Sequence, residues 1–214
     1  MKYRNIFKTM EEYNNSSLSY PNISLIIDDN KVIVSNKRTQ PNNEIWYTST
    51  DGNVVEVDTS RINPLILVSN TYENGKGVLK FKDDITSLPT FCFVGCSTFK
   101  TINLPNSLTT IGDSAFRKCE NLIEINFSKE SQLTTIGNYG FIVCSKLPSI
   151  VIPKSVTSIG DFAFSDCYKL NDVYYDGTKD ELKSISSNLT FKHSVPTTCI
   201  VHCSNGDYPI SDFN

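Results

Sequence analysis

The sequence lacks any apolar run long enough to cross a bilayer. Its longest apolar stretches, such as Ile62 to Val68, fall far short of the roughly 20 residues that a membrane-spanning helix needs. The N-terminal stretch MKYRNIFKTMEEYNNSS places acidic and amide side chains where a secretory signal would need an unbroken apolar segment. These absences predict a soluble chain without an export signal.

An excess of basic charge is also missing. The chain carries 20 Lys and Arg against 23 Asp and Glu, which gives a formal net charge of -3. Because binding to phosphate backbones or anionic lipid needs clustered Lys and Arg, nucleic acid and membranes are not expected partners. Hydrophobic residues at 39% and charged residues at 20% of the 214 residues are typical of a globular chain of one domain or two small ones.

Motifs that carry catalysis are missing as well. The sequence contains no P-loop, no nucleotide-binding glycine cluster, no G-x-S-x-G and no EF-hand loop. Cys199, His202 and Cys203, with His193 nearby, are metal-ligand types, but their spacing is not that of a zinc site. A Cys–His nucleophile would also need an orienting group and an oxyanion pocket. We therefore predict no enzyme, no metal and no cofactor, with zinc and a Cys–His nucleophile as minor alternatives.

A repeat dominates the C-terminal half of the chain. Its anchors are Cys96, Cys119, Cys144 and Cys167, at successive separations of 23, 25 and 23 residues. Apolar columns recur before and after each anchor, and each unit is too short to bury its own apolar face, so we expect the columns to stack coil on coil. The predicted continuous core contains Ile111, Phe116, Ile125, Ile136, Phe141, Ile150, Ile159 and Phe164. Without a secretory signal, the seven Cys are expected to be reduced thiols.

Each coil is expected to contain one short strand. Apolar residues stand six and eight positions after each anchor, as in Ile102 then Leu104 or Ile125 then Phe127, which predicts strands that form a parallel sheet. GDSAFRKC and GDFAFSDC begin with Gly and Asp, which favours short helical or irregular segments on the opposite face. Asp113, Asn138 and Asp161 are accordingly interpreted as helix caps rather than ion ligands. The predicted fold class is an α/β-type solenoid of about four coils.

The repeat resembles a known family. SLTTIGDSAFRKCENLIEINF and SVTSIGDFAFSDCYKLNDVYY are similar to the leucine-rich repeat subfamily typified by the BspA surface proteins, and the resemblance covers about residues 83–176. It implies a BspA-like solenoid that works in binding or adhesion. The first coil departs from the pattern at Pro89 and Cys92 and the third at Gly140, and two residues are inserted around Lys129 to Gln132.

Caps are expected on both sides of the repeats. NEIWYTSTDGNVVEV predicts a hairpin around Asp51-Gly52, and LILVSNTYENGKGVLKF predicts another that turns at Asn74 to Gly77. Thr178 is the expected N-cap of a short helix, and TCIVHCSNGDY predicts a closing strand. The predicted order is an N-terminal anchor segment at 1–40, a hairpin cap at 41–84, the solenoid at 85–176 and a C-terminal cap at 177–214.

Residues 1–40 lack the repeat columns. IFKTMEEY favours a short helix, and YPNISLIIDDNKVIVSN predicts two strands with a turn at Asp29-Asn30. The opening stretch resembles N-terminal segments of virion proteins from phages that infect gut Bacteroidales, which implies an anchor to a parent assembly. The side chains expected to make that contact are Phe7, Tyr13, Tyr20, Ile23 and Leu25.

The outward positions of the predicted strands form two stripes of mostly polar side chains with one aromatic. They are Thr101, Asn103, Glu124, Asn126, Ser149, Val151, Asp172 and Tyr174. For any single residue simple solvation is the favoured interpretation, but the stripe as a whole suits contact with a carbohydrate or a protein.

Two hypotheses for function follow from these features. The leading one is a non-enzymatic component of a phage particle, a head fibre or tail-associated decoration. Its solenoid would contact host glycan or a neighbouring protein, while residues 1–40 bind other virion proteins. The alternative is a bacterial cell-surface adhesin of the BspA type that binds host or partner-cell proteins. Assembly of identical chains stays open.

Overall fold

The computed structural model describes residues 24–28, 31–35, 40–186, 190–191 and 193–213. The chain divides into two compact units, Met1–Gln40 and Pro41–Asn214. In the first unit, β1 (Ser24–Asp28) and β2 (Lys31–Ser35) pair antiparallel, which confirms the two strands predicted there. Leu25 is described only as part of β1. The other predicted anchor residues, Phe7, Tyr13, Tyr20 and Ile23, and the helix predicted at IFKTMEEY lie outside the described residues.

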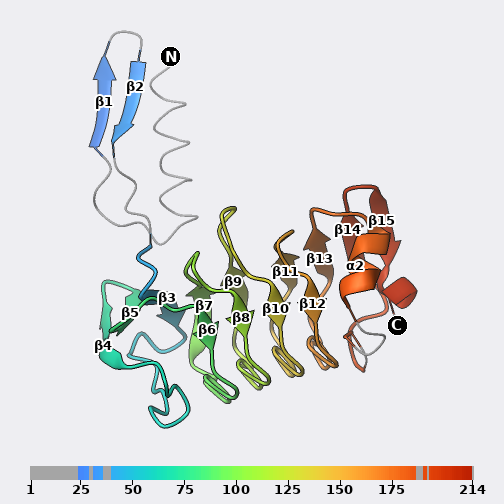
Figure 1. Ribbon diagram of the computed structural model, residues 1–214, viewed down its shortest axis with the longest axis horizontal. Helices are drawn as coiled ribbons and strands as arrows, with labels where there is room; N and C mark the ends of the chain where they lie inside the picture. Colours follow the sequence, from blue (N-terminus) through green and yellow to red (C-terminus); the bar gives the residue numbers. More distant parts are fainter. Residues whose placement is uncertain (1–23, 29–30, 36–39, 187–189, 192, 214) are drawn as a thin grey trace. The chain divides into compact units, whose positions relative to one another are not determined.

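The second unit is built around a solenoid of about four coils, as the repeat predicts (Figure 1). Each coil has three sides. The first side carries β7 (Phe99–Asn103), β9 (Glu124–Asn126), β11 (Ser149–Ile152) and β13 (Asp172–Tyr175). The second carries two-residue strands, β6 (Ser87–Leu88), β8 (Thr110–Ile111), β10 (Thr135–Ile136) and β12 (Ser158–Ile159), paired in parallel.

The third side consists of tight turns rather than helical segments. Two residues of each turn have positive φ, for example Tyr139 at 58° and Val143 at 62°. Their backbone donors are satisfied by the next coil, since the N–H of Tyr139 donates to Asp161 O at 2.8 Å and that of Val143 to Ser165 O at 3.0 Å. The left-handed residues stop the chain from continuing as a helix, and stacking of coils takes over the hydrogen bonds that a helix would make internally.

The polar column in these turns does not cap helices, and that expectation is wrong. Asp113 Oδ1 accepts a hydrogen bond from the backbone N–H of Asn138 at 2.8 Å, and Asn138 Oδ1 accepts one from the N–H of Asp161 at 2.8 Å. The column therefore links each coil to the next. The side-chain oxygens of Asp113 and Asn138 thus satisfy backbone donors that belong to the following repeat.

The left-handed turns lead to a stability prediction. Val143 is β-branched, and such a residue in the left-handed region costs about 1–2 kcal/mol, whereas Asn tolerates it. We expect Val143→Asn to raise the free energy of unfolding in urea by roughly 1 kcal/mol. The matched control is Val151→Asn in the extended strand β11, which should give no gain. Equal effects at the two positions would contradict the strain at Val143.

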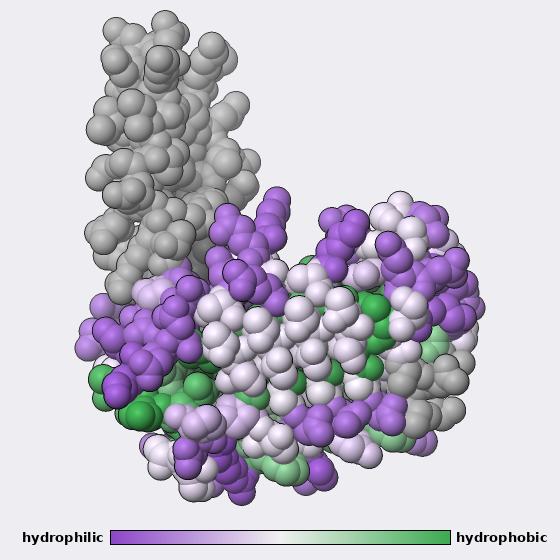
Figure 2. Space-filling model, in the orientation of Figure 1, coloured by the Kyte–Doolittle hydropathy of each residue, from purple (hydrophilic) through white to green (hydrophobic). Residues whose placement is uncertain are grey.

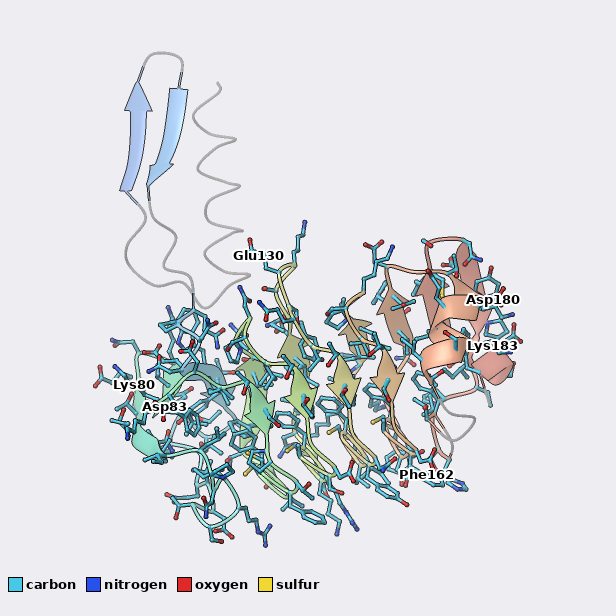
Figure 3. All side chains as sticks on the ribbon, viewed as in Figure 1. Lys80, Asp83, Glu130, Phe162, Asp180 and Lys183 are labelled. Carbon is cyan, nitrogen blue, oxygen red and sulfur yellow. The ribbon has the colours of Figure 1, made fainter. Side chains whose placement is uncertain are left out.

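The core is a set of ladders that run from coil to coil (Figure 3). All eight predicted core residues belong to one buried cluster, which confirms that prediction. Centroids of successive Phe rings are separated by 5.4, 5.1, 5.5 and 5.5 Å through Phe93, Phe116, Phe141, Phe164 and Phe191. Phe191 is a rung that sequence reasoning missed, because no Cys stands three residues after it. The repeat therefore extends into the segment predicted as a cap.

The repeated Cys do more than fill space between the Phe rungs. The thiols of Cys119, Cys144 and Cys167 donate to the carbonyl oxygens of Phe93, Phe116 and Phe141 in the preceding coil, at 3.2, 3.3 and 3.3 Å. Burial raises the pKa of Cys167 to about 12, so this thiol keeps its proton at neutral pH. All seven Cys are free thiols.

The N-terminal cap contains β3 (Glu44–Ser49), β4 (Leu67–Glu73) and β5 (Lys76–Phe81). The hairpin predicted at Asn74 to Gly77 is confirmed by the antiparallel pairing of β4 and β5. The hairpin predicted at Asp51-Gly52 is wrong, since residues 54–57 form no strand. The reason is that β5 occupies one edge of β3 and the first coil strand, β7, occupies the other. The pairing of β3 with β7 covers the open end of the solenoid.

The sheet on the first side is interrupted, which the sequence prediction of one parallel sheet did not anticipate. The strand orders are β4-β5-β3-β7-β9 and β11-β13-β14-β15. Beside β9 and β13, the N–H groups of Ile123 and Asn171 donate to Lys100 O and Pro148 O of the preceding coil, at 2.9 and 2.8 Å. The equivalent residue of the third coil is Pro148 itself, which has no N–H to donate. The sheet therefore splits between β9 and β11.

The C-terminal cap begins with α2 (Lys179–Ile185), whose capping box of Thr178 and Glu181 confirms the predicted helix start. The predicted closing strand is a hairpin. β14 (Ile200–Cys203) pairs parallel with β13, and β15 (Gly206–Pro209) returns antiparallel before the 3-10 helix Ile210–Phe213. Within the part of the chain that the structure describes, no helix is both long and apolar enough to span a bilayer.

Candidate functional site

All eight predicted site residues lie on the outward face of β7, β9, β11 and β13. Thr101 and Asn103 belong to β7, Glu124 and Asn126 to β9, Ser149 and Val151 to β11, and Asp172 and Tyr174 to β13; each is exposed or half-buried. We call this surface the first-side face. The interruption between β9 and β11 divides it into two halves with different chemistry.

The N-terminal half of the first-side face is polar and internally hydrogen-bonded. The hydroxyls of Thr101 and Thr48 are 2.8 Å apart, which extends the polar row onto β3 of the cap. Asn126 Nδ2 donates to Asn103 Oδ1 at 2.9 Å across neighbouring strands. These bonds hold amide and hydroxyl groups in defined positions, an arrangement that can present fixed donors and acceptors to a ligand.

The C-terminal half carries an aromatic pair. Strand register places Val151, Tyr174 and His202 side by side on β11, β13 and β14. Tyr174 and His202 stack with ring centroids 4.6 Å apart and planes 13° apart. Val151 is 54% exposed and Tyr174 is 42% exposed, so this part of the face presents apolar surface to solvent.

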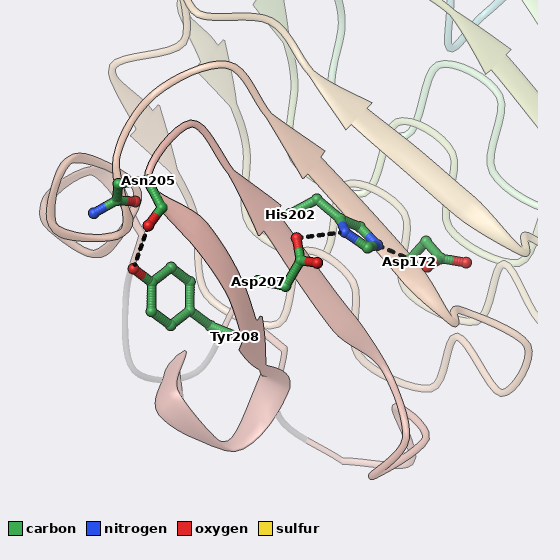
Figure 4. Close-up of polar contacts among 5 residues, drawn as sticks. All are labelled: Asp172, His202, Asn205, Asp207 and Tyr208. Carbon is green, nitrogen blue, oxygen red and sulfur yellow. Dashed lines mark hydrogen bonds and ion pairs between the residues drawn. The ribbon is translucent and has the colours of Figure 1, made fainter.

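His202 was considered from the sequence only as a metal ligand or a catalytic base, and its place on the first-side face was missed. Figure 4 shows its ring between two carboxylates: Nε2 lies 2.9 Å from Asp172 Oδ1, and Nδ1 lies 2.9 Å from Asp207 Oδ1. A neutral imidazole has one N–H, so donating to both carboxylates at once requires the protonated ring. The hydrogen bond to Asp172, followed by that to Asp207, raises the pKa of His202. The parallel pairing of β13 with β14 brings His202 to Asp172, and the antiparallel pairing of β14 with β15 places Asp207 opposite His202.

The His202 cluster predicts a pH dependence of stability. The titratable side chains in contact with the ring are Asp172, Asp207 and Tyr174. Because the folded-state pKa of His202 is raised, its contribution is complete below the unfolded-state pKa and is lost as pH rises through the folded-state pKa. We expect His202→Gln to cost more in urea unfolding at about pH 5 than at about pH 8.5, on either side of the usual pKa of about 6.5. In an Asp172→Asn, Asp207→Asn background the difference should vanish, and its persistence would contradict the assignment.

The candidate zinc ligands are not brought together. Cys199 is buried and Cys203 packs against the core, whereas His202 faces outward between its carboxylates. His193 lies on the turn side, stacked on Phe162 with centroids 5.8 Å apart. Among the described residues, no three His, Cys, Asp or Glu side chains converge as metal ligands. The same separation of Cys and His side chains argues against a nucleophilic pair.

The second side of the coils presents a different surface. Its strands place Ser87, Thr110, Thr135 and Ser158 in one register, and Figure 2 shows a pale expanse over these strands, neither strongly hydrophilic nor hydrophobic. The neighbouring threonine hydroxyls donate to carbonyl oxygens of the preceding coil: Thr109 to Thr86, Thr134 to Thr109 and Thr157 to Thr134. These hydroxyls serve the stacking of coils. Within the described ranges of the chain, the second-side strands carry no exposed large hydrophobic side chain, whereas the first-side face carries Val151 and Tyr174 and is the better binding candidate.

Comparison with known families agrees with the repeat geometry. The family described as "BspA type Leucine rich repeat region (6 copies)" matches residues 72–196. The chain belongs to this family. The match extends the repeat beyond the predicted 85–176 on both sides, and at the C-terminal end it includes the Phe191 rung. No curated protein matches the chain. The comparisons give no support to the resemblance of residues 1–40 to virion proteins.

Several solved structures resemble this BspA-type chain. A leucine-rich repeat protein of T. pallidum is 27% identical with a TM-score of 0.41, over 57% of this chain and 47% of that one. A leucine rich cell surface protein of Faecalibacterium prausnitzii is 26% identical with a TM-score of 0.43, over 49% of this chain and 33% of that one. A leucine-rich repeat protein of Bacteroides capillosus is 23% identical with a TM-score of 0.40, over 65% and 98%. The chain thus spans less than half the length of the first two.

Proposed function

We propose that this BspA-type protein is a non-catalytic binding protein of the bacterial cell surface and that it contacts its partner through the first-side face. The observation that supports the proposal is the exposed Val151 and Tyr174 beside fixed polar groups, a combination typical of recognition surfaces. A catalytic role for His202 is disfavoured because both of its ring nitrogens are occupied by carboxylates, which leaves neither free for proton transfer.

A direct test compares two faces of the same solenoid. Binding of the full chain to a panel of purified extracellular-matrix proteins and oligosaccharides would be measured by surface plasmon resonance. Val151→Lys, on the first-side face, should abolish binding to whichever panel member the wild type recognises. Thr135→Lys, on the second side, is the matched control and should leave it unchanged. Absence of any ligand in the panel, or loss of binding only in Thr135→Lys, would count against the proposal.

The alternative function is a component of a phage particle. It uses the same binding face and differs only in the assembly to which the chain is attached. In either case we propose that residues 1–40 dock the chain to a larger assembly, with the predicted contacts of Phe7, Tyr13, Tyr20, Ile23 and Leu25. The division of the chain between Gln40 and Pro41 supports a separable segment. The first residues of the second unit are held by that unit itself, because the N–H of Ile85 donates to Asn42 O at 2.8 Å.

Deletion of residues 1–40 tests the docking proposal. The remaining chain should unfold in urea as cooperatively as the full chain and should keep its ligand, while incorporation into the parent assembly should be lost. A shortened chain that still joins the assembly, or one that fails to fold, would remove the case for a separate anchor. Capsid or tail genes beside the coding gene would favour the virion alternative, and secretion or glycan-utilisation genes would favour the cell surface.

A further inference from the structure

We infer that the step between Val151 and Tyr174 is a stacking site for one pyranose ring of a neutral sugar chain, an inference that rests on the proposed binding role of the first-side face. The step lies on the C-terminal half of that face. Its wall is the ring of Tyr174 on β13, and its floor is the side chain of Val151 on the neighbouring strand.

The wall arises from a difference in side-chain length. Val151 and Tyr174 are directly paired across β11 and β13, and His202 is paired with Tyr174 on its other side. His202 covers one face of the Tyr174 ring, with planes 13° apart. A valine side chain ends at its γ-carbons, so Val151 can cover only the inner part of the tyrosine ring on the next strand. The 42% exposure of Tyr174 agrees with one covered face and one open face.

The wall is held rigidly before any ligand arrives. His202 is bound at both ring nitrogens, by Asp172 of β13 and by Asp207 of β15, each at 2.9 Å. The stacked histidine therefore fixes the orientation of Tyr174 from behind. A ring already ordered loses little conformational entropy when a ligand stacks on it, which favours binding of a weakly interacting sugar. His202 is a positioning residue in this arrangement.

The surroundings of the step favour a neutral sugar over a charged or protein ligand. Ser149, Glu124 and Asn126 provide hydroxyl, carboxylate and amide groups on the adjoining outward positions, which suit sugar hydroxyls. The carboxylates of Asp172 and Asp207 are both hydrogen-bonded to the ring of His202, which reduces their attraction for a cationic peptide. On the four first-side strands, Val151 and Tyr174 are the exposed large hydrophobic residues, too few for the desolvated centre of a protein interface.

Calorimetric titration of the full chain with cellohexaose, mannohexaose, xylohexaose and maltohexaose tests the inference. At least one hexaose should bind, and Tyr174→Ala should weaken that binding about tenfold, the upper range for a lost aromatic contact. Tyr168→Ala removes a tyrosine outside the face that is more exposed than Tyr174, 54% against 42%, and should leave the affinity unchanged. Val151→Phe, which fills the step without removing Tyr174, should also block binding. His202→Gln should weaken binding less than Tyr174→Ala.

Two results would overturn the inference. One is that none of the four hexaoses binds the wild-type chain. The other is a hexaose that binds equally well to Tyr174→Ala and Val151→Phe, with thermal unfolding confirming that both variants are folded. If a matrix protein binds and depends on Val151 while all four hexaoses fail, the sugar site is wrong and the proposed binding function stands. If neither a protein nor a sugar depends on the first-side face, both fail.

Discussion

Replacing Phe141 with alanine should lower the free energy of unfolding by about 3 to 5 kcal/mol, the usual cost of removing a buried phenylalanine. Phe141 is fully buried and stacks on Phe116 at 5.1 Å and on Phe164 at 5.5 Å. Its loss leaves a cavity in the middle of the ladder and removes two ring contacts at once. Because each coil is stabilised by its neighbours, the damage falls on both interfaces of the third coil.

Phe91→Ala is the matched control for this experiment. Phe91 loses the same atoms on truncation but is 45% exposed in a turn, so it has much less buried surface to lose than the fully buried Phe141. In urea denaturation, the loss of unfolding free energy should be several-fold larger for Phe141→Ala than for Phe91→Ala. If the midpoint for Phe141→Ala moves no further than that for Phe91→Ala, the stacked core does not stabilise the fold in the way described.

Gly137→Ala should be the second severe substitution. A Cβ at Gly137 would lie 2.5 Å from Asp113 Oδ1, 2.7 Å from Asp113 N and 2.8 Å from the carbonyl carbon of Gly112. Most of this obstruction is backbone of the preceding coil, which cannot move without separating the two repeats. We expect a loss of about 3 kcal/mol, the upper end of the usual range for overpacking. Thermal or urea unfolding measures it.

Gly140→Ala is the matched control for Gly137→Ala. Ala115 and Ala163 occupy the position of Gly140 in the second and fourth coils, both fully buried. A Cβ at Gly140 would meet Gly137 O and Ile136 Cγ2 at 3.1 Å, a tight contact that other coils accommodate. Gly140→Ala should therefore stay within about 1 kcal/mol of the wild type. Similar losses at Gly137 and Gly140 would show that close coil approach is not the cause.

Several predicted features depended on contacts that recur within every repeat. Ile111, Phe116 and Ile136 are core residues because each packs against its counterpart one repeat away, so the period of the sequence already contains the packing partner. The outward stripes followed from strand alternation in the same way. Helix α2 was predictable from Thr178 and Glu181 because a capping box is made within four residues.

Contacts between segments that do not belong to the repeat could not be predicted from the sequence period. Whether β3 pairs with residues 54–57 or with β5 and β7 depends on which edges are free in the folded cap. The split at Pro148 follows from a missing donor, but only the alignment of β9 with β11 shows which bond is lost. Phe191 became a rung without a Cys signal because the fourth coil offers the face of Phe164.

The candidate site shows the same division between local pattern and folded contact. Val151, Asp172 and Tyr174 were placed on an exposed face by alternation alone, since a strand residue two positions from an inward one also points inward and the one between points out. The meeting of Tyr174 with His202 and Asp207 required the chain to pass through α2 and return as β14 against β13. Repetition determined the solenoid and its face, and the pairing of the non-repeating strand β14 with β13 decided where on that face the stacked tyrosine and histidine stand.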